Sequence, residues 1–180
     1  MNKLLLPLLL LTFSFLTSCS HTTAMQFTKA QGGVMVTLPE HHLAVTIPDG
    51  WAVAEKAPAG SILLAAGDKG NLRFAITGPL GNNKSTPADS LVRSGVYQKG
   101  VQGELLDGKF TKIDRSTITT VAGVEAYRCD ASRKDSARSI IQVHLPHKNH
   151  ILVLSLYSTK QPVSQVTAMT RILTSVQHVP

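Results

Sequence analysis

A cysteine near the N-terminus, preceded by small side chains, has the clearest chemical potential in this sequence. Lys3 comes before an almost wholly apolar run at 4–16, and Thr17, Ser18 and Cys19 follow that run. The run has 13 residues, whereas a helix that spans a bilayer needs about 20, so we predict a cleavable secretory signal peptide rather than an anchor helix. A thiolate can form a thioether with a lipid, and small residues before it let a peptidase reach the adjacent bond.

The segment Leu16-Thr17-Ser18-Cys19 resembles the lipobox of bacterial lipoproteins. The resemblance implies that signal peptidase recognises Leu16, Thr17 and Ser18 and cuts before Cys19. Cys19 then becomes the mature N-terminus and carries three acyl chains, and two or more chains make membrane attachment effectively permanent. Ser20 occupies the position where an Asp commonly retains Gram-negative lipoproteins at the inner membrane. Because no Asp occupies this position, we expect the outer membrane facing the periplasm, if the organism is Gram-negative.

Seven histidines raise the question of a metal site. His144, His147 and His150 are spaced three apart, and we expect them at a hairpin, where they would be exposed. A four-residue loop at 146–149 would put His144 and His150 on opposite faces of the sheet, whereas a five-residue loop would pair them on one face. A zinc site on these three histidines therefore depends on a one-residue register, and the pair at 41–42 could add a further ligand.

Cys129 is the only cysteine left once Cys19 is acylated. It lies in a strand-like stretch, so we expect a buried free thiol that packs as a small hydrophobic group. The sequence contains neither a Gly-x-Ser-x-Gly elbow nor a His-Glu-x-x-His motif. It also offers no carboxylate spacing that favours glycoside hydrolysis. These observations predict a protein that is not an enzyme and that has no cofactor other than the covalent lipid on Cys19.

The chain is basic, with 18 Lys and Arg against 11 Asp and Glu. Residues 1–18 contain one Lys and no acid, so the mature chain carries 17 against 11, or +6. Such a charge favours anionic lipid surfaces, whereas nucleic acid is a poor partner because an exported protein does not meet it routinely. The densest basic group is predicted to be a solvated strand edge or turn; it contains Arg128, Arg133, Lys134 and Arg138, interrupted by Asp130 and Asp135.

Periodicity in the mature chain predicts a tether at 19–33 and one domain at 34–180. Hydrophobic alternation and turn residues predict strands at 34–38, 43–47, 61–66, 72–77, 104–106, 109–120, 125–132, 139–145 and 150–157. The strand at 150–157 is apolar on both faces and should be central. Strands joined by hairpin-like connections, with two helices between and after them, predict an α+β fold in which helices pack on an antiparallel sheet.

Two helices are predicted from their start signals. One begins at Pro87 and ends before Gly100, and the other begins at Pro162. The apolar stripe of the second helix is predicted to contain Val166, Met169, Ile172, Leu173 and Val176.

The corner Val45-Thr46-Ile47-Pro48-Asp49-Gly50-Trp51 resembles the opening of PsbP-like domains. The helix and strand order over 34–178 is similar too, including that of DcrB-type envelope lipoproteins. The resemblance implies an α/β/α sandwich. It also implies an accessory or binding role, because the family is mostly non-enzymatic, and it supplies no catalytic residues to carry over.

Taken together, these features predict a membrane-anchored envelope lipoprotein that acts as a binding, accessory or assembly factor. Its expected partners are the membrane, through the lipid anchor, and an envelope protein; the oligomeric state is left open. The alternatives are a hydrolase acting on cell-wall or lipid material and a carrier of a small ligand. Polar groups clustered in a deep pocket would favour the hydrolase, an enclosed apolar cavity the carrier, and a shallow apolar or basic patch the binding role.

Overall fold

The computed structural model describes residues 24–80, 86–108, 110–160 and 162–180. Within these ranges the strands form two antiparallel sheets. The small sheet has the order β1 (Gln26–Ala30), β2 (Gly33–Leu38), β3 (Leu43–Pro48) and β11 (Gln177–His178). The large sheet has the order β4 (Ala52–Val53), β5 (Ser61–Gly67), β6 (Leu72–Leu80), β10 (His150–Ser158), β9 (Ser139–His147), β8 (Val124–Ser132) and β7 (Lys112–Val121).

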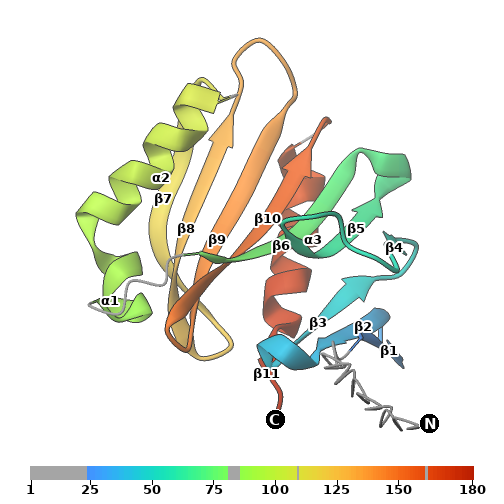
Figure 1. Ribbon diagram of the computed structural model, residues 1–180. Helices are drawn as coiled ribbons and strands as arrows, with labels where there is room; N and C mark the ends of the chain where they lie inside the picture. The colour runs from blue at the N-terminus through green and yellow to red at the C-terminus, as the bar shows by residue number, and fades with distance from the viewer. Residues whose placement is uncertain (1–23, 81–85, 109, 161) are drawn as a thin grey trace, which may run out of the picture.

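Layers pack on both faces of the large sheet (Figure 1). Helices α1 (Ala88–Arg93) and α2 (Gly95–Gly108) pack on one face, against β7, β8 and β9. Helix α3 (Pro162–Ser175) lies on the other face, against β9 and β10, and also contacts β3 of the small sheet. The structure thus confirms the expected α+β class, with helices packed on antiparallel sheets.

Strand β10 lies in the middle of the large sheet, as predicted, and its side chains alternate between two hydrophobic cores. Leu152 and Leu154 belong to the core under α3 and the small sheet, while Ile151 and Val153 belong to the core under α1 and α2. All four are buried. A strand that is apolar on both faces requires a covering layer on each side, and the fold supplies both.

The predicted end of the first helix and the predicted strand at 104–106 are wrong. Helix α1 stops at Ser94, which has an extended ψ of 128°, and α2 then continues through Gly100 to Gly108. Val101 and Leu105 are four residues apart on α2, and both are buried. Their contact with the sheet outweighs the weak helix propensity of glycine. The strand predicted from residue 109 begins at Lys112.

Part of the predicted tether is a strand, so the ordered sheet begins at Gln26 rather than at Val34. Strand β1 pairs with β2 through a turn in which Gly32 has a φ of 77°. Gly33 lies in β2, and a Cβ atom there would lie 2.0 Å from the carbonyl oxygen of Ile47. The two glycines therefore serve a tight turn and a close backbone approach rather than flexibility.

The corner that carries the family resemblance closes one end of the small sheet. The Trp51 backbone N–H donates to the Pro48 carbonyl at 3.2 Å, and Gly50 has a φ of 78°. The Trp51 ring lies over Gly67 of β5, where an added Cβ would be 2.2 Å from the indole. Trp51 therefore packs against the core.

The apolar stripe of α3 differs from the prediction at one position. Met169, Ile172 and Val176 are buried, but Val166 is 43% exposed. Gln165 is buried in the stripe instead, where its amide donates to the Leu156 carbonyl at 2.6 Å. A buried amide is tolerated here because both its donor and acceptor groups find partners.

The basic group expected at a solvated edge is partly buried. The Arg128 guanidinium donates two hydrogen bonds to Asp130, Nε to Oδ1 and Nη2 to Oδ2, each at 2.8 Å. The exposed fractions of the two side chains are 9% and 14%. By contrast, Arg133 and Asp135 form an exposed pair, as predicted for this group.

We expect Asp130→Asn to lower the free energy of unfolding by about 3 kcal/mol, because it leaves the Arg128 charge buried without its carboxylate. Urea denaturation followed by circular dichroism measures the loss. The matched variant Asp135→Asn should leave stability nearly unchanged, because water screens that pair. Equal losses in the two variants would contradict the assigned burial of the Arg128–Asp130 pair.

Candidate ligand-binding site

A cavity of about 490 Å³ opens where the small sheet meets the first strands of the large sheet. We call it the inter-sheet pocket. It lies between the start of β1, the end of β2 with the following 3₁₀ turn, and the segment that leads into β5. Its lining residues are Ala24, Met25, Leu38, Pro39, Glu40, His41, Glu55, Lys56, Ala57, Ser61 and Ile62.

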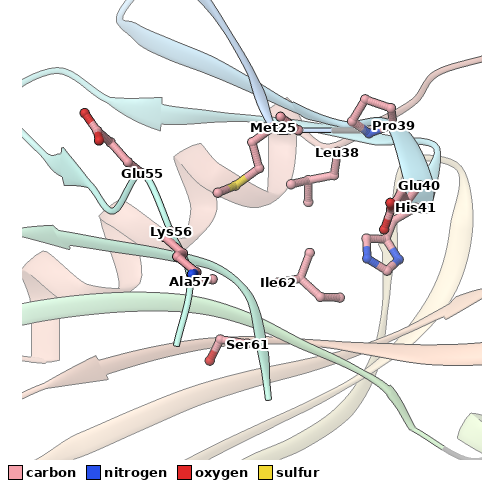
Figure 2. A pocket seen from close by; sticks show the side chains of 11 residues that line it. Met25, Leu38, Pro39, Glu40, His41, Glu55, Lys56, Ala57, Ser61 and Ile62 are labelled. Atoms are coloured by element: carbon pink, nitrogen blue, oxygen red, sulfur yellow. The ribbon is translucent and has the colours of Figure 1, made fainter. Parts of the chain in front are cut away.

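The interior of the inter-sheet pocket is apolar and its ends are charged (Figure 2). The side chains of Met25, Leu38 and Ile62 point toward the space between the strands. Glu40 and His41 lie at one end, and Glu55 and Lys56 lie at the other. Volume and composition match those of small-molecule sites, in which apolar walls provide contact area and a few polar groups set orientation.

Local backbone features aim these side chains into the pocket. Pro39 ends β2, and His42 adopts a left-handed φ of 46° that returns the chain into β3. The register between β5 and β6 shifts between Ser61 and Leu63, so Ile62 is the extra residue of a bulge. Bulges re-aim side chains, and Ile62 packs toward the same core as its neighbour Leu63.

A second cavity, of about 290 Å³, lies next to the inter-sheet pocket and shares Glu40 and His41 with it. The tip of the β9–β10 hairpin lines its far side. His147 pairs directly with His150 across a two-residue turn, so the predicted loops of four and five residues are both wrong. Pro146 lies within β9 opposite Ile151. The pairing of β9 with β8 ends at His144 of β9. The missing N–H of Pro146 therefore costs no hydrogen bond to β8.

His147 is buried, although we predicted it to be exposed. Its exposed fraction is 8%, and among the described residues neither ring nitrogen has a hydrogen-bond partner. The ring stacks on His178 of β11, with 5.4 Å between ring centroids. Burial, reinforced by His178 and Lys148, lowers the pKa of His147 to about 4. His147 is therefore a neutral ring that packs β11 against the hairpin.

His144 is also buried and points to the opposite face of the sheet, under α2. The Tyr97 hydroxyl and His144 Nδ1 are 2.8 Å apart, and Tyr127 lies opposite His144 in the ladder. Burial lowers the pKa of His144 to about 4 and, with help from Glu104, raises the pKa of Tyr97 to about 12. The Tyr97–His144 pair is thus neutral at pH 7.

The structure does not bring together the three histidines of the zinc hypothesis. His147 and His150 face each other, but His144 points away from both. In the part of the chain that the structure describes, no group of three His, Cys, Asp or Glu side chains is placed to hold a metal ion.

The other predicted chemical groups divide between the core and the undescribed N-terminus. Cys129 is fully buried, as expected, and burial raises the pKa of its thiol. It packs in the core under α1 and α2. Leu16, Thr17, Ser18 and Cys19 lie outside the described residues, so the lipobox stays a prediction from sequence. Within residues 24–180, apart from the gaps given above, no helix is long and apolar enough to cross a membrane.

Solved structures with a similar fold include chains from two bacteria. A chain from Bacteroides thetaiotaomicron superposes with a TM-score of 0.55 and 12% identity, over 83% of this chain and 49% of that one. LpqN, a protein involved in cell envelope biogenesis of Mycobacterium tuberculosis, superposes with a TM-score of 0.51 and 14% identity, over 77% of this chain and 83% of its own. This chain spans about half the length of the Bacteroides chain.

No protein-family model matches this chain, and no curated protein matches it. The two structural neighbours share the fold at identities too low to transfer a function. The resemblance to PsbP-like and DcrB-type domains stays a prediction.

The two buried histidines predict a loss of stability in mild acid. Their folded pKa is about 4, against an ordinary value of 6.5. Below pH 6.5 the unfolded chain binds protons that the folded chain does not bind, so stability is complete above that pH and falls as the pH approaches 4. We expect a loss of at most about 3 kcal/mol from His144 alone. Urea titrations at stepped pH values measure the slope.

Replacing His147 by Phe should flatten this acid slope and should not lower stability at pH 7, because an apolar ring needs no hydrogen bonds. His150→Phe at the opposite hairpin position is the matched control, since that ring is only partly buried. An unchanged slope in His147→Phe would show that His147 is not a buried neutral ring.

Proposed function

We propose that this protein is a lipid-anchored envelope lipoprotein whose folded domain is a non-catalytic binding module, with the inter-sheet pocket as its binding site. One observation carries the proposal. Ala24 and Met25, the first described residues, line the pocket, and they follow the lipobox cysteine Cys19 by only a few residues. The anchor and the binding site are therefore neighbours in the chain.

Two features support an accessory role in the envelope. The signal peptide and the Cys19 motif direct the chain to a membrane surface. LpqN, which shares the fold, is involved in cell envelope biogenesis. At the identity given above this likeness concerns the fold, and the envelope role of LpqN supports the proposal as an analogy.

The pocket itself favours binding over hydrolysis. Its charged groups are split between its two ends, with Glu40 and His41 far from Glu55 and Lys56, rather than gathered as a catalytic set. General bases work best with a pKa near the operating pH. Burial lowers the pKa of His41, the histidine of this pocket, below its usual value and therefore away from the operating pH. A carrier of a small ligand would require an enclosed cavity. This pocket opens at the edge between the sheets, so it favours the binding role over the carrier role.

The test is in-cell photocrosslinking of the full-length protein. A photoreactive side chain replaces Ala57 in the pocket or, as the control, exposed Thr117 on the outer strand β7. We expect position 57 to capture a defined envelope component that position 117 does not capture, as identified by mass spectrometry. Cys19→Ala should release the protein from the membrane and abolish labelling by a fatty-acid analogue.

Two results would contradict the proposal. Identical capture at positions 57 and 117 would mean that the pocket is not a binding site. Retention of the fatty-acid label in Cys19→Ala would mean that Cys19 is not the anchor.

A further inference from the structure

The short connection between Cys19 and the inter-sheet pocket sets how far the pocket can be from a membrane. Ala24 follows Cys19 by five residues. Even a fully extended chain of that length spans at most about 18 Å. An acylated Cys19 therefore keeps Ala24, and with it the mouth of the pocket, within about 18 Å of the membrane anchor. Ligands that reside in the bilayer are then the most concentrated ones at this site.

An apolar strip leads from the pocket to the exposed edge of the small sheet. Phe27 of β1 pairs with the buried Val36 of β2, so its side chain lies on the inner face of the sheet, as do those of Met25 and Leu38 in the pocket. Phe27 is nevertheless 47% exposed, and Val34, on the same face of β2, is 37% exposed. Exposed apolar groups that continue a pocket wall mark a path for an apolar ligand.

The polar groups along this path suit a lipid whose headgroup stays in water. Lys29 pairs with Val34 on the same face, so an ammonium lies at the outer end of the strip. Lys56 is at one end of the pocket. Positive side chains attract lipid phosphates. Met25 lines the interior with a flexible apolar side chain, and methionine accommodates apolar ligands of irregular shape.

From these placements we infer that the inter-sheet pocket takes up an acyl chain of a bilayer phospholipid, which enters over Phe27 and Val34. The inference rests on the proposed function, because it names the ligand of the same pocket and uses the same anchor. It goes beyond that proposal by specifying a lipid as the ligand.

The test uses the full-length acylated protein reconstituted into vesicles of phosphatidylethanolamine and phosphatidylglycerol. The phosphatidylethanolamine carries a photoreactive diazirine near the end of one acyl chain. After irradiation, mass spectrometry maps the labelled residues. We expect label on Met25, Leu38 and Ile62, and little on Thr28, which belongs to the same strand as Phe27 but points to the outer face. Thr28 thus reports simple proximity to the bilayer.

Ile62→Glu places a charge in the pocket and should reduce pocket labelling by about tenfold or more, because a carboxylate disfavours an apolar ligand. Ile118→Glu is the matched control on β7, where Ile118 is 36% exposed; its labelling should equal that of the wild type. Ile62→Trp fills the pocket without a charge and should also reduce labelling. Thermal unfolding by circular dichroism shows that the variants fold.

Label spread equally over Thr28 and the pocket residues, or pocket label unaffected by either Ile62 variant, would overturn the inference. Absence of lipid label while position 57 still captures a protein in cells would overturn the lipid assignment alone. Absence of both lipid label and capture at position 57 would overturn the proposed function as well.

Discussion

The rest of the structure depends on the requirement that β10 be covered on both faces. Leu154 and Val153 are adjacent residues that face different cores, and both are buried. One helical layer, α1 with α2, satisfies one face. The other face is shared between α3 and the small sheet, because α3 contacts the large sheet mainly at β9 and β10 and also packs against β3. Small-sheet residues such as Val45 complete the same core as Leu154. A sheet packed on a sheet leaves an open margin where strands end, and a pocket can form at that margin.

The inter-sheet pocket lies at such a margin, and its composition follows from its place. Ile62 and Leu38 extend the shared core to its edge, whereas Glu40 and Glu55 remain at the rim, where water can solvate a carboxylate. The adjoining cavity differs, because its polar ring is buried rather than left at a solvated rim. There His147 is buried with no hydrogen-bond partner among the described residues, and it is kept neutral by burial and by neighbouring imidazoles. His178 stacks on this ring.

Elements with strong periodicity were predictable from sequence, and those defined by tertiary contacts were not. The two-sided apolar run of β10 and the start of α3 at Pro162 matched the structure. The continuation of α2 through Gly100 was not predictable from local propensity, since it depends on contacts of Val101 and Leu105 with the large sheet. The inter-sheet pocket had no motif, because its residues come from three separate segments. The alternation of Met25 and Phe27 was the available signal for β1.

Residue type alone misassigned the histidines, and the reason bears on how this protein can act. Imidazole is a metal ligand, a base or a neutral packing group, and only the surroundings select among these roles. His144 and His147 are buried, and burial lowers the pKa of each ring to about 4, so they pack as neutral groups. Neither is placed to act at the surface as a base or a metal ligand. The inter-sheet pocket, by contrast, is an accessible apolar cavity with a charged rim beside the first described residues. A pocket of this kind functions by binding a ligand. The short segment between an acylated Cys19 and the pocket would determine which ligands the pocket can reach. The location of the pocket relative to the anchor, more than any single side chain, is therefore the feature on which a function for this domain depends.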